Sequence, residues 1–360
     1  MEKKHVIFAM KIVIAGILLG IFAGFLGVNP LGISQEQVVV ALSSLFLGLG
    51  LITTILTFYF IRKSHQAYKS YQREEEDEEN YDTGDAALDN TRNQDEIGEK
   101  EILVVSFGTS FNDSRRLTIG AIEDAIEKSQ PDFSVRRGFT SQIIIDHVKK
   151  RDNVSIDNVT EALDRAVKNG VKTLVIQPTH LMNGLEYTDL VNEIAENADS
   201  FEQVAVGEPL LTSDADFKAV IQAITDATKE YDDGETAICF MGHGTEAESN
   251  QVYAKMQDML TEEGFEHYYV GTVEATPSLD DVLAKVKEGS YKKVVLEPLM
   301  IVAGDHANND MAGDEEGSWK TTFEEAGYEV KCLVRGLGEL EPIQQLFVEH
   351  AKAAVDSLAK

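Results

Sequence analysis

The sequence predicts an α/β fold: two similar α/β halves, with parallel sheets flanked by helices, around a cleft and preceded by two transmembrane helices. Three observations support this prediction. From Glu101 onward, short apolar runs alternate with segments whose apolar residues recur at helical spacing, which is typical of βαβ units. The motif Ser106-Phe-Gly-Thr-Ser110 recurs as Gly242-His-Gly-Thr-Glu246, which indicates a duplication. Two long uncharged apolar runs precede this region.

Residues 1–63 are predicted to form a two-helix membrane anchor. The apolar runs 12–28 and 38–61 contain no charged residue, and the second is long enough to cross a hydrocarbon core of about 30 Å. Lys and Arg flank the outer ends of this 12–61 segment and are absent from the turn within it, so we expect the following domain in the cytoplasm. A cleaved signal peptide is the alternative, which the second long run disfavours.

Residues 64–100 are predicted to form an acidic, disordered linker. The segment 74–98 contains eleven acidic residues and one arginine, and it has too few apolar residues to fold alone. Most of the remaining negative charge, out of a net −30, belongs to the domain that follows. This charge argues against nucleic acid as a partner. Cys239 and Cys332 lie in apolar runs and are interpreted as core residues.

Apolar runs and helical spacing place the elements of the two halves, 101–235 and 236–360. Glycine or proline directly follows several of the expected strands, which marks their ends. In the first half we expect strand 102–106, helix 117–126, strand 134–139, helix 159–167, strand 172–177, strand 203–207 and helix 217–231. In the second half we expect strand 237–241, helix 250–263, strand 268–271, helix 279–287, strand 293–297 and strand 329–334.

Two histidines at strand ends are the main candidates for chemistry. His243 follows one buried strand and has glycine on both sides, while His306 lies in a polar turn after another. Ligands of α/β proteins bind at the carboxyl ends of strands, and imidazole there can bind a divalent metal or transfer a proton. Aligning the repeats at an offset of 120 places Glu186 on His306, so Glu186 is a third candidate. The alternatives to these functional roles are that the two histidines are structural residues held by hydrogen bonds, and that Glu186 lies at a helix start because the helix dipole favours it there.

Substrate contacts are expected near the first strand end. Phe107 and Thr109 belong to the loop there, Arg115 and Arg116 follow it, and Gly244 is its counterpart in the repeat. Guanidinium groups beside a helix start bind carboxylates or phosphates, although surface ion pairs are the alternative. The sequence lacks a phosphate-binding loop and a nucleophile elbow, so neither a nucleotide cofactor nor hydrolase chemistry is expected.

These motifs resemble the anaerobic-type sirohydrochlorin cobaltochelatases, a family with the class II chelatase fold. The resemblance extends from Glu101 to the C-terminus and omits the anchor and linker. It rests on five segments that occur in the family's order: 102–110, 118–122, 137–141, 241–245 and 299–311.

The resemblance implies ATP-independent insertion of Co²⁺ into sirohydrochlorin, a nitrogen–metal bond-forming lyase reaction of anaerobic cobalamin biosynthesis. It implies His243, His306 and Glu186 as catalytic and metal-binding residues. The tetrapyrrole carries many carboxylates, and Arg115, Arg116, Arg136 and Arg137 are the expected basic patch. A homo-oligomer of this chain is left as an open alternative to a monomer.

One departure from the family pattern keeps alternatives open. Where the family commonly has a second histidine after the Gly-His-Gly-Thr motif, this chain has Glu246 to Asn250. Imidazole ligands also suit Fe²⁺ and Ni²⁺, so a chelatase for one of these metals is an alternative. A non-catalytic, membrane-tethered carrier of a tetrapyrrole or metal is the other.

Overall fold

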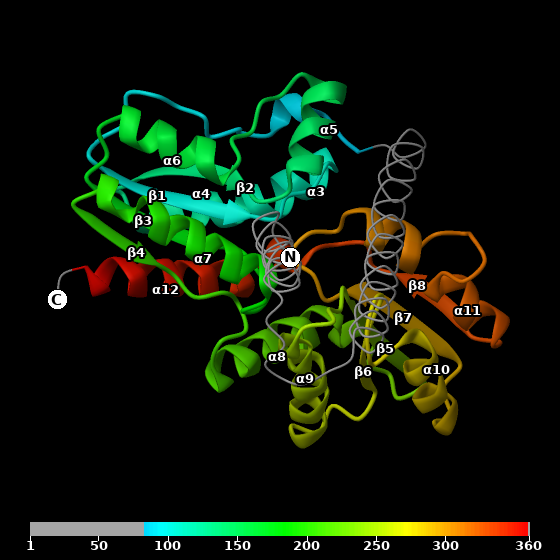
Figure 1. Ribbon diagram of the computed structural model, residues 1–360. Helices are drawn as coiled ribbons and strands as arrows, with labels where there is room; N and C mark the ends of the chain where they lie inside the picture. The colour runs from blue at the N-terminus through cyan, green and yellow to red at the C-terminus, as the bar shows by residue number, and fades with distance from the viewer. Residues whose placement is uncertain (1–82, 359–360) are drawn as a thin grey trace, which may run out of the picture. The chain divides into compact units, whose positions relative to one another are not determined.

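The computed structural model describes residues 83–358, which belong to one compact unit (Figure 1). The predicted anchor, 1–63, and residues 64–82 of the predicted linker lie outside the described residues. Between residues 83 and 358, no helix is both long enough and apolar enough to cross a membrane.

Two four-stranded parallel sheets with the same topology form the two halves, which confirms the predicted α/β duplication. The first sheet has the order β2-β1-β3-β4 and the second β6-β5-β7-β8. The strands of the first sheet are β1 (Lys100–Ser106), β2 (Ser134–Phe139), β3 (Thr173–Pro178) and β4 (Gln203–Val206). Those of the second are β5 (Thr236–Gly242), β6 (Tyr268–Thr272), β7 (Lys293–Pro298) and β8 (Glu329–Cys332).

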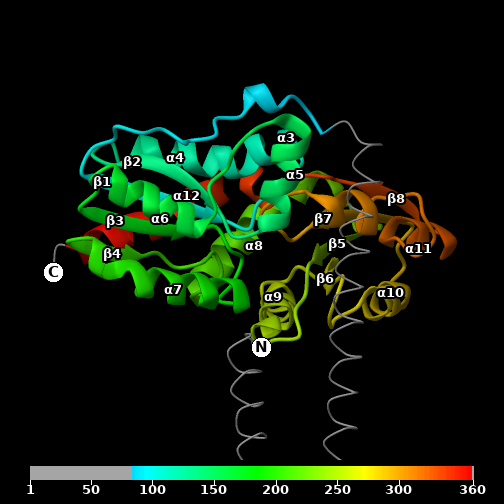
Figure 2. The same ribbon diagram turned by 45° about the horizontal axis from the view of Figure 1, so that its top comes forward.

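Helices connect the strands and cover both faces of each sheet (Figures 1 and 2). In the first half they are α3 (Asn112–Arg115), α4 (Ala121–Ser129), α5 (Gln142–Asp152), α6 (Val159–Lys168), α7 (Leu185–Asn197) and α8 (Asp214–Thr228). In the second half they are α9 (Gln251–Glu262), α10 (Leu279–Glu288), α11 (Trp319–Glu325) and α12 (Glu341–Ser357). Capping boxes at Asn158, Ser213 and Ser278 satisfy the free amide groups at the starts of α6, α8 and α10.

The alternation of side chains along the strands buries both faces of each sheet. In β1, Leu103 and Val105 belong to a cluster with α6 and α7, whereas Ile102 and Val104 belong to a cluster with α4, α8 and α12. The second sheet follows the same pattern, and Cys239 is one of its buried core residues, as predicted. Because helices cover both faces of each sheet, we look for functional polar side chains at the carboxyl ends of the strands.

The last helix corrects the predicted boundary between the halves. We assigned all of 236–360 to the second half, but α12 contacts α4, β3 and β4 of the first half. Its buried residues, among them Ile343, Phe347 and Ala351, form the apolar face that covers the first sheet. In exchange, α8 contacts α9 of the second half, so the two halves share one hydrophobic cluster.

The described part of the predicted linker is ordered. Residues 83–99 pack against the first half, with a short 3-10 helix at Ala86–Leu88 and with Asp89 and Arg92 buried. The prediction of disorder is wrong for this stretch because two of its charged side chains, Asp89 and Arg92, pair with buried side chains of the folded domain. We call residues 83–97 the strap.

Candidate metal centre

Three side chains meet at the carboxyl edge of the second sheet. His243 directly follows β5, Glu274 follows β6, and His306 lies in the turn after β7. Parallel strands end at the same edge, so these three positions converge there. The amide of Glu274 donates to the carbonyl of His243 at 2.9 Å, which holds the two residues side by side.

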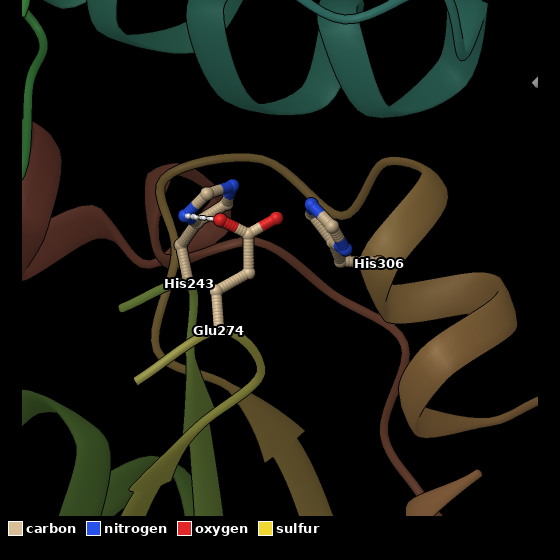
Figure 3. A group of neighbouring side chains, drawn as sticks. All are labelled: His243, Glu274 and His306. Atoms are coloured by element: carbon tan, nitrogen blue, oxygen red, sulfur yellow. Dashed lines mark ion pairs between the residues drawn. The ribbon is translucent and has the colours of Figure 1, made fainter. Parts of the chain in front are cut away.

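The three side chains are close enough to share one metal ion. The imidazole centroids of His243 and His306 are 4.7 Å apart, with the rings nearly perpendicular at 83°. One donor atom on each of His243, Glu274 and His306 lies within 4.8 Å of the donor atoms on the other two. Figure 3 shows the Glu274 carboxylate between the two rings, with an oxygen 3.9 Å from Nδ1 of His243.

Hydrogen bonds leave Nε2 of both histidines available. Nδ1 of His243 lies 2.8 Å from the carbonyl oxygen of Gly244, which can only accept, so Nδ1 carries the proton. Nδ1 of His306 bonds the Asp310 carboxylate at 2.7 Å. A carboxylate or carbonyl on the other nitrogen is the usual arrangement that orients a metal-binding histidine. Both rings therefore present an Nε2 lone pair.

Glycine at position 244 is required by this geometry. Its φ is +86°, in the region that favours glycine. A Cβ there would also lie 2.9 Å from both the backbone nitrogen of Ala275 and the Cβ of Thr272. Gly244 thus brings its carbonyl to His243 within the tight contact of the β5 and β6 loops.

The pKa of His306 is displaced upward by its surroundings. Burial by itself lowers this pKa, but the hydrogen bond and negative charge of Asp310 raise it by more, with a further contribution from Asp305. The net result is a pKa above the usual value of a histidine. The metal-free site therefore keeps the proton on His306 to a higher pH than a free imidazole does. A metal ion that binds Nε2 must displace this proton.

This displacement predicts a pH dependence of metal binding. Because only neutral His306 binds metal, Co²⁺ affinity is expected to rise as pH increases through the raised pKa. In Asp310→Asn the midpoint of this rise is expected to move to lower pH, since the charge that stabilises the imidazolium is gone. Its high-pH affinity is expected to fall about tenfold through loss of the orienting carboxylate. Co²⁺ titrations followed by visible absorption between pH 5.5 and 9 measure both effects. An unchanged midpoint would contradict the role of Asp310.

The site is accessible from the solvent. The side chains of His243 and Glu274 are about half exposed, and that of His306 is 30% exposed. Since neither imidazole is sealed within the core, a metal ion and a flat ligand can approach them.

The first half contacts the turn that carries His306. Ala303 donates its amide to Oγ of Ser114 at 2.9 Å. Thr109 also lies close to this turn. A Cβ added to Gly304 would be 3.1 Å from Oγ1 of Thr109. Thr109 and Gly244 were both predicted to bind substrate. Both residues are buried, so their position is consistent with a role in supporting the metal centre. Phe107, from the same prediction, has a 52% exposed side chain.

Glu186 is the predicted ligand that the structure does not bring into this group. It is exposed at the start of α7 in the first half, while Glu274 supplies the carboxylate beside the two histidines. Its charge adds to burial in raising the pKa of Tyr253, whose hydroxyl accepts from the amide of Gly244 at 3.3 Å. Burial lowers the pKa of nearby His180 to about 4, against the opposing charge of Glu186.

Glu274 was missed in the sequence. The strand-end rule that selected His243 and His306 also applies to the strand 268–271, which Glu274 follows closely. An acidic residue after a strand is common without a ligand role, so only the order β6-β5-β7 reveals that it lies beside β5.

The predicted basic patch for substrate carboxylates is wrong for three of its four arginines. Arg115, Arg136 and Arg137 are fully buried. They are neutralised internally by ion pairs: Arg115 with Asp89, Arg136 with Glu101, and Arg137 with Asp89 and Glu123. Arg116 is the fourth; it is partly exposed and pairs with Asp113 at 3.0 Å.

Comparison with known proteins identifies the family of the chain. A protein family described as cobalt chelatase (CbiK) matches residues 100–356. The chain belongs to this family. It is 37% identical over 258 residues to a sirohydrochlorin cobaltochelatase of Salmonella typhimurium, covering 72% of this chain and 97% of that one. It is 30% identical over 262 residues to the sirohydrochlorin cobaltochelatase CbiKC of Nitratidesulfovibrio vulgaris, covering 72% of this chain and 92% of that one.

A solved structure shares the fold of this CbiK-family chain. SirB from Bacillus subtilis, in a structure with Fe³⁺, superposes with a TM-score of 0.50 at 13% identity, over 73% of this chain and 98% of SirB. At this identity the likeness concerns the fold alone. It supports the chelatase-like architecture predicted from the sequence.

Proposed function

We propose that this chain is a sirohydrochlorin cobaltochelatase, a lyase that inserts Co²⁺ into sirohydrochlorin without ATP in anaerobic cobalamin biosynthesis. The observation that carries the proposal is the group of His243, Glu274 and His306 at one strand edge of a CbiK-family domain. Two imidazoles and a carboxylate are borderline and hard donors, a set that suits Co²⁺. Iron and nickel suit the same donors and are the alternative metals.

The donor geometry supports a direct transfer of the metal to the macrocycle. Three protein donors on one side leave coordination positions open on the other, and pyrrole nitrogens enter there as protein donors leave. The balanced step joins Co²⁺ to the tetrapyrrole and releases two pyrrole protons. A histidine with a protonated Nδ1 cannot accept a proton while its Nε2 is bound to the metal, so a carboxylate outside the metal site is the proposed acceptor at that stage.

We assign proton acceptance to Glu186 and metal binding to Glu274. Glu186 stands outside the three-residue group and on the other half, whereas Glu274 lies beside both histidines. In Glu274→Gln, Co²⁺ affinity in the absence of tetrapyrrole is expected to fall about tenfold or more. In Glu186→Gln, Co²⁺ affinity is expected to stay within about twofold while kcat falls about a hundredfold, the usual contribution of a general base. Equal loss of affinity in both variants would contradict the division of roles.

A metallation assay tests the function itself. The full-length chain, sirohydrochlorin and Co²⁺ are mixed, and the absorption change of the macrocycle is compared with that of metal and tetrapyrrole alone. Acceleration supports the enzyme, and tight binding without acceleration supports the carrier. Parallel reactions with Fe²⁺ and Ni²⁺ identify the preferred metal.

We also propose that residues 1–63 anchor this catalytic domain to the cytoplasmic face of a membrane. The apolar runs 12–28 and 38–61 and the lysines and arginines that flank them support this topology. Cleavage of the domain by protease added outside intact cells would contradict the proposed orientation.

A further inference from the structure

The strap, residues 83–97, precedes the segment that matches the CbiK family, which begins at residue 100. It nevertheless contributes two charged side chains to a buried ion-pair network of the first half. Asp89 is 9% exposed and Arg92 is 2% exposed, and the partners of both lie in the following domain. Charged side chains are rarely buried unless they are paired, so these contacts define one position for the strap.

Arg92 attaches the strap to α4 and to the edge strand β2. Its guanidinium lies 3.2 Å from the buried carboxylate of Glu123 and also pairs with Asp124. The side-chain amide of Gln94 donates from Nε2 to the carbonyl of Val135 at 2.8 Å, and Nη1 of Arg92 approaches the same carbonyl. The strap thereby pairs a backbone carbonyl of this edge strand.

Asp89 neutralises two buried arginines at once. Its Oδ2 accepts from Nε of Arg115 at 2.7 Å and from Nη1 of Arg137 at 2.6 Å, and its Oδ1 accepts from Nη2 of Arg137 at 3.1 Å. Arg137 also pairs with Glu123, whereas Asp89 is the carboxylate in direct contact with Arg115 among the described residues. Neutralisation of the buried Arg115 charge by an ion pair therefore depends on the strap.

Arg115 connects this network to the metal centre. Its Nη1 donates to the carbonyl of Thr109 at 3.2 Å and approaches that of Ser110, both in the loop after β1. Thr109 in turn packs against Gly304, two residues before His306. The contacts form a continuous path from Asp89 in the strap, through Arg115 and the β1 loop, to the turn that holds His306.

We propose that the strap is a working part of the metal centre and that Asp89 is its positioning residue. By pairing with Arg115, Asp89 fixes the β1 loop against the Gly304 turn and so holds His306 at the distance at which it shares a metal with His243 and Glu274. This inference rests on the proposed metal-binding role of those three residues. It adds to the family site a requirement that lies outside the family's own segment.

The test compares strap variants of the full-length chain by Co²⁺ titration and by hydrogen exchange of the loop 107–114 without metal. In Asp89→Asn, loop exchange is expected to accelerate at least about tenfold and Co²⁺ affinity to fall about tenfold, the scale of losing a group that supports a ligand. Asp89→Glu restores the charge and is expected to recover most of both. Asp95→Asn, which removes a strap carboxylate paired with Arg165 on α6, is the matched control and is expected to change neither.

A second control separates positioning from general stability. Arg92→Met removes a buried strap charge that contacts α4 and β2 but not the β1 loop. If it lowers Co²⁺ affinity as much as Asp89→Asn at a temperature at which both are folded, Asp89 acts only through stability and the proposal is overturned. If Asp89→Asn does not fold, Asp89→Asn/Arg115→Met removes the unpaired charge and is expected to fold and show the same rapid loop exchange. Unchanged loop exchange in the folded variant overturns the proposal.

The two readouts also separate this inference from the proposed function. Loop exchange is measured without metal, so it reports on the strap even if the wild-type chain binds no Co²⁺ at the three residues. Absence of Co²⁺ binding by the wild type would instead contradict the metal centre itself.

Discussion

Replacing His306 with alanine is expected to lower the rate of cobalt insertion at least about tenfold, and up to about a hundredfold. His306 supplies one of the two Nε2 donors, and its ring centroid lies only 4.7 Å from that of His243. The variant leaves His243 and Glu274 as donors, so Co²⁺ binds more weakly and the fraction of enzyme that carries metal falls. Initial rates measured over a range of Co²⁺ concentrations give the size of the loss.

The matched control for this variant is His350→Ala. His350 lies on α12, where it contacts Asp216 and the carbonyl of Glu208, away from the strand edge that holds the site. Its removal is expected to leave insertion within about twofold, because a substitution distant from the site affects only the folded fraction. Wild-type turnover in His306→Ala would remove His306 from the mechanism.

Replacing Arg137 with methionine is expected to destabilise the folded domain by about 3–5 kcal/mol. Arg137 is fully buried on β2 and pairs with Glu123 at 2.7 Å and with Asp89 at 2.6 Å, both of which are also buried. Removing one partner of a buried ion pair leaves an unpaired buried charge, which costs this much free energy. Urea unfolding followed by circular dichroism measures the loss.

An exposed ion pair provides the comparison for Arg137. Lys292 pairs with Glu235 at 3.0 Å with both side chains largely exposed, so Lys292→Met is expected to leave the unfolding midpoint unchanged. A small effect of Arg137→Met, comparable with that of Lys292→Met, would show that the network of Arg92, Arg115 and Arg137 is not a stability determinant.

Most of the fold follows from local patterns in the sequence. The eight strands between residues 83 and 358 were predicted within a few residues, because most of them are short apolar runs with turn residues at their ends. Helix α5 was not among the helices predicted from the sequence; in the structure Ser141 caps its start by accepting from the amide of Ile144. The return of α12 to the first half was also missed, since the apolar face of a helix does not reveal which sheet it covers.

The site was predictable where a residue lies in a distinctive motif. His243 and His306 follow buried strands in glycine-containing turns, and the structure brings their rings together. Glu274 lacks such a motif, and its role depends on the spatial order of the strands. The prediction that the arginines bind substrate was wrong for a different reason. The sequence does not distinguish an arginine that faces a substrate from one that pairs with a buried carboxylate such as Glu123 or Asp89.

The central claim is that one Co²⁺ ion is bound by His243, Glu274 and His306 together. A crystal structure of the chain with Co²⁺, with anomalous scattering recorded at the cobalt edge, tests it most directly. The account predicts one strong anomalous peak within about 2.0–2.3 Å of Nε2 of both histidines and of a Glu274 oxygen. A peak bound instead by Asp305 and Asp310, or one that leaves His243 without a cobalt bond, would contradict it.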